Sequence, residues 1–336
     1  MTDPILIEVT RGPLVESWHR GAVAVVSPTG AFALRLGDVD RPVYPRSAIK
    51  ALQALPLIET GTADHFGYGS AEIALACASH AGTERHTSLA AAMLERAGLQ
   101  ADALGCGAHP PLGVSAANAL IASGRQPNQL HNNCSGKHAG MLATAVHLGE
   151  ATKGYCDPAH PVQRRIHRAL SDMSGLPLGL DVQGIDGCSV PNWAMPLSVL
   201  ARTFARLVTG TGLDAPRRQA AQRILDACWE HPDLVAGKSR ADTVVMRALP
   251  RRVFMKTGAE GVYCGAFPEL GLGFALKIED GAKRAAAGAA MALVERLYPA
   301  ARGLMPVGAI KTWRGVEVGA IRSSAAFEDA LASLKV

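Results

Sequence analysis

The sequence has no basic run, no long apolar stretch and no secretory signal, and each absence excludes a class of protein. The net charge is +5 over 336 residues and its arginines are scattered, so neither nucleic acid nor an anionic membrane is expected as a partner. No uninterrupted apolar stretch reaches about 18 residues, so we expect no membrane span. The N-terminus lacks a basic segment followed by an apolar one. We therefore predict a soluble, cytoplasmic protein.

Paired cysteines are also absent, because the seven cysteines are spread along the chain without a C-x-x-C motif. An odd number of scattered cysteines in a chain without a secretory signal argues against a disulfide framework. Cys134 and Cys188 lie in polar, glycine-containing loops before helix-like segments, a setting that lowers a thiol pKa and collects anions. Their spacing alone favours two ordinary loop thiols over a zinc site.

Strand-like segments lie near both ends of the chain, and helix-like segments lie between them. The strand-like segments are Ile5–Val9, Ala22–Ser27, Phe32–Leu36, Arg252–Lys256, Gly261–Ala266 and Leu272–Ile278. The helix-like segments are Ser47–Leu55, Thr87–Ala97, His138–Leu148, Pro161–Met173, Pro191–Val208, Arg217–Trp229 and Ala282–Leu297. This order predicts an α+β fold, with one antiparallel sheet built from the N- and C-terminal strands and packed with helices. We expect a single domain over residues 1–336 with a central, mainly helical part at about 47–250.

Ser47-Ala48-Ile49-Lys50 is an S-x-x-K sequence at the start of the first helix-like segment, with Pro56 as its expected stop. Residues three apart on a helix share a face, so the hydroxyl and the amine can meet. A desolvated lysine can accept the serine proton as a neutral amine. The pattern is common by chance, so by itself it predicts catalysis only weakly.

Lys256-Thr257-Gly258 follows a strand-like segment near the other end of the chain. A lysine at a strand end beside a glycine turn can point into a cleft, although an isolated triplet more often is a solvated strand end. S-x-x-K near the N-terminus combined with K-T-G near the C-terminus is used by serine β-lactamases and penicillin-binding proteins. The two motifs together therefore predict an acyl-transfer enzyme.

The run His131-Asn132-Asn133-Cys134-Ser135-Gly136-Lys137-His138 is far more specific than either motif. With it, the segments Tyr44–Lys50, Ser79-His80, Asp186–Pro191 and Lys256–Gly261 make the chain resemble the Rhizobium etli-type (class 3) L-asparaginases over nearly its whole length. That family is related in fold to serine β-lactamases and glutaminases, which agrees with the order of strands and helices.

The resemblance implies roles for a set of polar residues. Two Ser–Lys pairs would be Ser47 with Lys50 and Ser79 with Lys256. One zinc ion would be held by Cys134, Lys137 and Cys188, against the indication from cysteine spacing. Residues near the substrate or the metal-bound water would be Arg46, His138 and Asp186. A homodimer is also implied.

We therefore expect hydrolysis of L-asparagine to L-aspartate and ammonia. Lys50 would deprotonate Ser47, which would attack the side-chain amide and form a β-aspartyl ester. Ser79 and Lys256 would relay protons, and Arg46 would bind the substrate α-carboxylate. Ser79 is the alternative nucleophile, and the zinc is expected to position the substrate.

Three alternatives stay open at this point. A glutaminase or related amide hydrolase would share the mechanism and differ in its rates with L-Asn and L-Gln. A β-lactam-interacting acyl enzyme would be labelled by a fluorescent penicillin. A non-catalytic amino-acid sensor would bind L-Asn without releasing ammonia, although such a protein has no need for two Ser–Lys pairs.

Overall fold

The computed structural model describes residues 2–305 and 308–334, and its contacts divide the chain into two compact units. The sheet unit comprises the chain up to Ala48, Met195–Thr211 and the chain from Val244 onward. The helical unit comprises Ile49–Ala194 and Gly212–Thr243. The expectation of a single domain stays a prediction, and each unit is described by itself.

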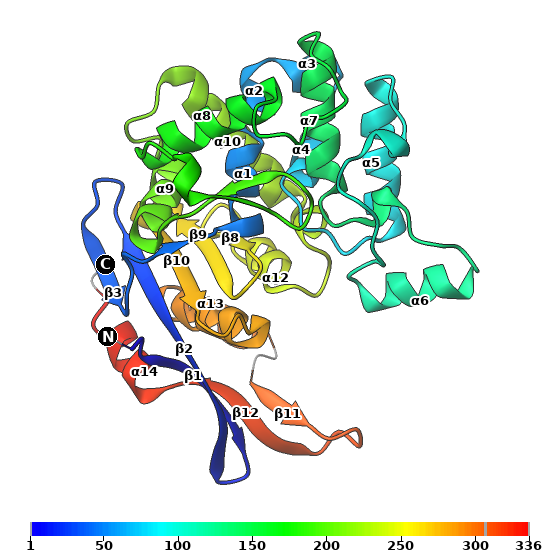
Figure 1. Ribbon diagram of the computed structural model, residues 1–336. Helices are drawn as coiled ribbons and strands as arrows, with labels where there is room; N and C mark the ends of the chain where they lie inside the picture. The colour runs from blue at the N-terminus through cyan, green and yellow to red at the C-terminus, as the bar shows by residue number, and fades with distance from the viewer. Residues whose placement is uncertain (1, 306–307, 335–336) are drawn as a thin grey trace. The chain divides into compact units, whose positions relative to one another are not determined.

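An antiparallel sheet of eight strands forms the centre of the sheet unit (Figure 1), with the order β11-β12-β1-β2-β10-β9-β8 and β3 on β2. The strands are β1 (Ile5–Arg11), β2 (Leu14–Val26), β3 (Phe32–Leu36), β8 (Phe254–Thr257), β9 (Val262–Phe267), β10 (Leu272–Ile278), β11 (Ala309–Lys311) and β12 (Glu317–Ser323). All of their pairings are antiparallel. The predicted α+β fold, with a sheet from both ends of the chain, is confirmed.

The long strand β2 connects the two halves of this sheet, since it pairs with both β1 and β10. Every residue from Ala22 to Val26 is buried, and successive side chains of a strand point to opposite faces, so both faces are covered here. Helix α9 (Leu197–Thr209) packs closely on β10: a Cβ at Gly273 would lie 2.1 Å from Ala201 O. Helices α13 (Lys283–Leu297) and α14 (Ala325–Ala332) complete the unit.

Two sequence-based helix boundaries are wrong, both near prolines. The segment expected to be helical from Pro191 instead begins with strands β6 (Pro191–Trp193) and β7 (Met195–Pro196), and α9 begins only at Leu197. A residue before proline is pushed toward extended backbone, so the helix cannot run through Met195 into Pro196. Pro56 does not end a helix either; it lies in the first turn of α2 (Leu55–Glu59), where its missing N–H has no cost.

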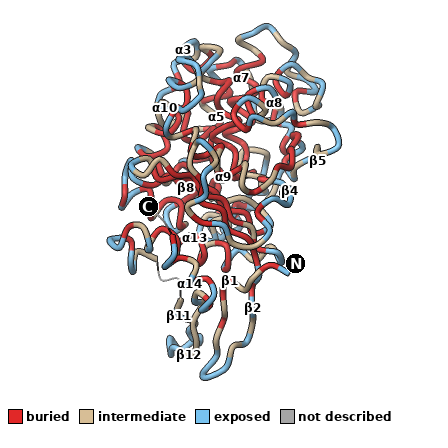
Figure 2. Tube along the Cα trace, turned by 90° about the vertical axis from the view of Figure 1, so that its left-hand side faces the viewer, coloured by how far each residue is buried: buried red, intermediate tan, exposed pale blue. Residues whose placement is uncertain are grey.

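The helical unit is built around helix α7 (Ser135–His147). Every residue of α7 from Ser135 to Ala145 is buried, and buried residues are red in Figure 2. The other helices are α1 (Lys50–Gln53), α2, α3 (Thr62–His65), α4 (Ser70–Ala76), α5 (Glu84–Arg96), α6 (Val114–Ala122), α8 (Pro161–Ser174), α10 (Ala215–Glu230) and α11 (Pro232–Val235). A short hairpin of β5 (Gln183–Ile185) and β6 belongs to this unit, and α12 (Ala241–Ala248) runs from it into the sheet unit. Among the described residues, no helix is long and apolar enough to cross a bilayer.

Candidate active site

The residues singled out in the sequence are distributed over both units. The sheet unit carries Arg46, Ser47 and Lys256. The helical unit carries Lys50, Ser79, Cys134, Lys137, His138, Asp186 and Cys188. The helical unit therefore contains all three expected zinc ligands, and it also contains one member of each expected Ser–Lys pair.

Lys50, the first residue of α1, is fully buried and its amine contacts three polar atoms. Nζ donates to the carbonyl oxygen of Ala78 at 2.5 Å, to Ser79 Oγ at 3.0 Å and to Cys134 Sγ at 3.1 Å. Ser79 follows α4 and is 4% exposed, and its backbone N–H is bonded to Val235 O at 2.9 Å. The structure thus joins Lys50 to Ser79, whereas the resemblance pairs Ser79 with Lys256.

Cys134, Cys188 and Lys137 form a second cluster that shares Cys134 with the first. Cys134 is the N-cap residue of α7 and Lys137 lies in its first turn. Cys188 lies in the turn between β5 and β6, which Ser189 closes with a left-handed backbone of φ 73° and an N–H bond to Asp186 O. The two thiols are hydrogen-bonded to each other, and Lys137 Nζ donates to Cys188 Sγ at 3.1 Å. All three side chains are almost fully buried.

The charges in this cluster are coupled. The hydrogen bond from the Cys134 thiol lowers the pKa of Cys188 to about 5 against the effect of burial, and the Lys137 amine acts in the same direction. The same hydrogen bond, together with burial, raises the pKa of Cys134 to about 12. Burial favours the neutral amine of Lys137, but the charge of the Cys188 thiolate, with a smaller contribution from Cys134, outweighs it and raises the pKa of Lys137. At neutral pH this cluster holds a thiolate and an ammonium side by side.

This donor set fits a zinc ion. Zinc prefers sulfur and nitrogen ligands in tetrahedral sites, and two thiols and an amine already lie in contact here. In the described part of the chain, no group of three or more His, Cys, Asp or Glu side chains is arranged to hold a metal. A metal at this position would therefore need Lys137 as its third protein ligand, and the amine would have to release a proton on binding.

His138 lies one residue further along α7 and is held by Tyr155, a residue that carried no sequence signal. The Tyr155 hydroxyl accepts a hydrogen bond from Gly105 N at 2.8 Å and lies 2.5 Å from His138 Nδ1. The tautomer of the imidazole decides which group donates: when the hydroxyl donates to Nδ1, the imidazole proton is on Nε2. Burial lowers the pKa of His138 to about 3. Within residues 2–305 and 308–334, Nε2 is buried without a hydrogen-bond partner.

In the sheet unit, the K-T-G turn lies beside the residues that precede Ser47. A Cβ on Gly258 of the K-T-G turn would come within 2.8 Å of Pro45 O, two residues before Ser47. Lys256, in β8, is fully buried and its Nζ donates to Thr257 O at 2.9 Å. Arg46 has a left-handed backbone with φ 53°, rare for a residue other than glycine, and Ser47 next to it is half-buried in a 3₁₀ turn.

Comparison with known proteins assigns the chain to a family. A family model described as L-asparaginase II matches residues 7–323. No curated protein matches the chain. A solved structure of Mglu in its native form is 17% identical with a TM-score of 0.46, over 82% of this chain and 63% of that one, so the chain spans less than two thirds of its length.

Two solved β-lactamases are also similar. The one from Mycobacterium bovis is 14% identical, covers 82% of this chain and 93% of its own, and has a TM-score of 0.40. The one from Sphaerobacter thermophilus is 15% identical, covers 86% and 93%, and has a TM-score of 0.40. Since the family model spans nearly all of the chain, this protein belongs to the L-asparaginase II family.

Proposed function

We propose that the enzyme cleaves the side-chain amide of L-asparagine by Ser–Lys acyl transfer, with Lys50 as the general base and Ser47 as the nucleophile. The observation that carries the proposal is the buried amine of Lys50, hydrogen-bonded to Ser79 Oγ at 3.0 Å and to Cys134 Sγ at 3.1 Å. A lysine acts as a base only as the neutral amine, whose lone pair accepts the proton; in that form the amine would keep two of its three donated hydrogen bonds. Ser47 precedes Lys50 by three residues in a continuous helical segment.

The proposed reaction has two halves. In the first, the Ser47 hydroxyl gives its proton to Lys50 Nζ while its oxygen attacks the amide carbon, and collapse of the tetrahedral intermediate releases ammonia, which takes up that proton. The product of this half is a β-aspartyl ester on Ser47. In the second half, water gives a proton to Lys50 and attacks the ester, and Lys50 passes that proton to Ser47 Oγ as the ester bond breaks and L-aspartate is released. Ser79, through its bond to Lys50, would pass the protons between the amine and the reacting groups.

Three further side chains are proposed to bind the substrate. Arg46 has the forked donors that suit an α-carboxylate. His138 has a buried Nε2 without a partner among the described residues, and in the tautomer with the proton on this nitrogen the neutral imidazole would donate to a substrate oxygen. Asp186 is the proposed acceptor for the α-ammonium group. Lys256 is proposed as a cationic proton relay on the strength of the resemblance.

Zinc is proposed as a cofactor, one ion per chain, held by Cys134, Cys188 and Lys137. When bound, it would supply a Lewis acid with an open position for a substrate oxygen. We propose a positioning role for it, because serine and lysine already supply the nucleophile and the base. The resemblance further leads us to propose a homodimer, which sedimentation velocity would test.

The assignment is tested by ammonia release from L-Asn and L-Gln, with zinc content measured on the same preparation. Ser47→Ala should lose activity and trap no acyl-enzyme, as read by mass spectrometry after acid quench. Ser174→Ala, a buried serine of α8, is the matched control and should keep full activity. If Ser47→Ala releases ammonia at the normal rate while Ser79→Ala does not, Ser79 is the nucleophile. Faster turnover of L-Gln would make the enzyme a glutaminase, and binding of L-Asn without ammonia release would make it a sensor.

A further inference from the structure

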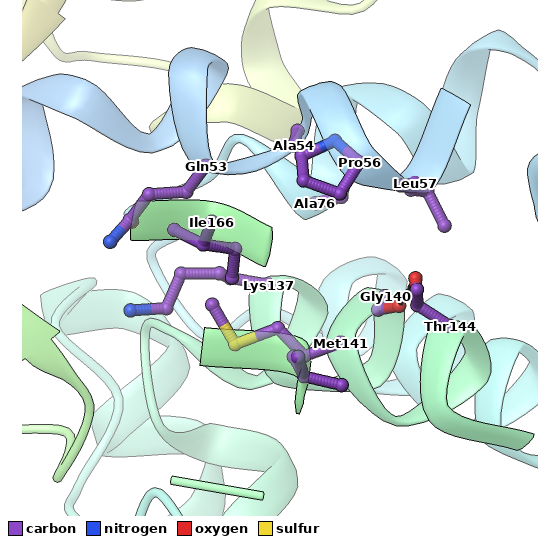
Figure 3. A pocket seen from close by; sticks show the side chains of 11 residues that line it. Gln53, Ala54, Pro56, Leu57, Ala76, Lys137, Gly140, Met141, Thr144 and Ile166 are labelled. Atoms are coloured by element: carbon purple, nitrogen blue, oxygen red, sulfur yellow. Dashed lines mark hydrogen bonds between the residues drawn. The ribbon is translucent and has the colours of Figure 1, made fainter. Parts of the chain in front are cut away.

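A small cavity inside the helical unit adjoins the thiol–amine cluster (Figure 3). It lies between α1–α2 on one side and α7–α8 on the other and has a volume of about 20 Å³. Most of its wall is apolar, including Ala54, Pro56, Leu57, Ala76, Met141 and Ile166. Two of its lining residues, Gln53 and Lys137, carry long polar side chains.

Gln53 is the last residue of α1, one helical turn after Lys50, and only 7% of its surface is exposed. Its side-chain amide has two donors and two acceptor lone pairs. Within the part of the chain that the structure describes, this amide makes no hydrogen bond to protein. The atoms of this amide are not among the described buried polar atoms that lack a partner, so the amide reaches the open side of the cavity, where water can bond to it.

The Lys137 amine also has fewer hydrogen-bond acceptors than donors among the described residues. Lys137 is 3% exposed, and among the described residues its Nζ donates to a single acceptor, Cys188 Sγ. An amine that ligates a metal keeps two N–H groups, and an ammonium has three, so at least one donor of Lys137 still needs an acceptor. Figure 3 shows the polar ends of Gln53 and Lys137 extending to the same side.

We propose that Gln53 is a positioning residue for Lys137 and that one water in the cavity joins Gln53 Oε1 to Lys137 Nζ. A water needs a cavity of about 10–15 Å³ and at least two polar partners, and the volume of about 20 Å³ and these two side chains supply both. This contact orients Nζ toward Cys188 Sγ. The inference rests on the proposed function in one respect, the assignment of Lys137 as a zinc ligand.

The consequence follows from how outer-shell partners act on metal sites. A group that hydrogen-bonds a ligand fixes its orientation, and its loss typically weakens metal binding by about 10- to 100-fold. Gln53→Met keeps the length of the side chain and removes the acceptor, whereas Gln53→Glu retains an acceptor oxygen. Thr144→Val is the matched control, since Thr144 lines the same cavity but its hydroxyl already donates to Gly140 O at 2.8 Å.

The experiment is a zinc titration of these variants against a chromogenic chelator, with KM and kcat for L-Asn measured on the same proteins. We expect Gln53→Met to weaken zinc binding by about tenfold or more and to raise KM with little change in kcat. Gln53→Glu should stay close to wild type, and Thr144→Val should be indistinguishable from it. Wild-type zinc affinity and KM in Gln53→Met would overturn the inference.

A high-resolution crystal structure of the metal-free protein separates this inference from the proposed function. Density for a water bonded to both Gln53 Oε1 and Lys137 Nζ supports the inference, and a map without it overturns the inference even if zinc binds. If the water is seen but the wild-type protein takes up no zinc, the proposed zinc site fails while the contact between Gln53 and Lys137 stands.

Discussion

Gly136 lies in the first turn of α7, between Cys134 and Lys137, where α7 crosses the end of α4. A Cβ at this position would lie 2.4 Å from Leu75 O and 2.5 Å from Leu75 Cγ, far inside van der Waals contact. Leu75 O also accepts the backbone hydrogen bond of Ala78, the residue before Ser79. Gly136→Ala must therefore move the two proposed clusters apart, because Cys134 and Lys137 are on one side of this contact and Ser79 is on the other.

Two opposing effects in α7 set the change in stability of Gly136→Ala. Forcing extra atoms into a packed core costs about 1–3 kcal/mol, and the severity of this clash places Gly136→Ala at the upper end. Replacing a helical glycine by alanine returns about 1 kcal/mol, which leaves a net loss of about 2 kcal/mol. Gly140→Ala, one turn further along, is the control, because its Cβ would meet its nearest atom, Leu57 Cδ2, at an ordinary 3.4 Å. That variant should gain up to about 1 kcal/mol.

The assay is urea denaturation of both variants, with ammonia release from L-Asn measured in parallel. We expect a lower midpoint for Gly136→Ala and a loss of about tenfold or more in kcat/KM, since displacements near 1 Å at a catalytic group cost about that much or more. Gly140→Ala should be as active as wild type. The reasoning is refuted if Gly136→Ala matches wild type in both measurements, or if the two alanine variants are equally damaging.

Other predictions concern the remaining buried polar groups. Lys50→Met should lower kcat for ammonia release by about 10²- to 10⁴-fold, and a smaller loss would remove Lys50 as the base. Tyr155→Phe leaves Gly105 N and His138 Nδ1 without their partner. We therefore expect the free energy of unfolding, measured by urea denaturation, to fall by about 1–3 kcal/mol; an unchanged midpoint would contradict this. Burial lowers the pKa of His80 well below its usual 6.5 and that of His138 to about 3. The unfolded chain therefore takes up protons first, and stability that is full above about pH 6.5 should fall below it by up to about 1.4 kcal/mol per pH unit for each histidine. In His80→Asn, the free energy of unfolding should fall less steeply between pH 7 and 5 than in the wild type. An unchanged slope would contradict the contribution assigned to His80.

Most of the strands that the sequence predicts contain several buried, β-prone residues, although β3 has only one, Leu34. Strands β9 and β10 are buried over almost their whole length and coincide closely with the expected segments. Strands β11 and β12 were not expected, and their residues are all at least partly exposed. Such strands lack the apolar pattern on which a prediction depends, and only pairing with β1 brings β12 into the sheet.

The sequence predicts which residues form the candidate site more fully than it predicts which of them are in contact. Cys134 and Cys188 are far apart in the sequence, so their meeting depends on the β5–β6 hairpin and on the left-handed backbone of Ser189. No local pattern encodes that approach, and the spacing of the cysteines alone indicates no metal site. Gln53 and Tyr155 gave no signal for a related reason, since each matters only through contacts made by folding.

The contacts of Lys50 show why the roles of the two clusters must be tested by substitutions at residues other than Lys50. The S-x-x-K motif connects Lys50 to Ser47 by local spacing, but the folded helical unit also connects it to Ser79 and Cys134. Any substitution of Lys50 therefore disturbs the proposed base and the proposed zinc ligand together. Ser79→Ala leaves the amine bonded to Ala78 O and Cys134 Sγ, so a loss of turnover with unchanged zinc affinity in that variant would report proton transfer alone. A simultaneous loss of zinc would instead mean that the two clusters act as one unit, held together by the Lys50 amine.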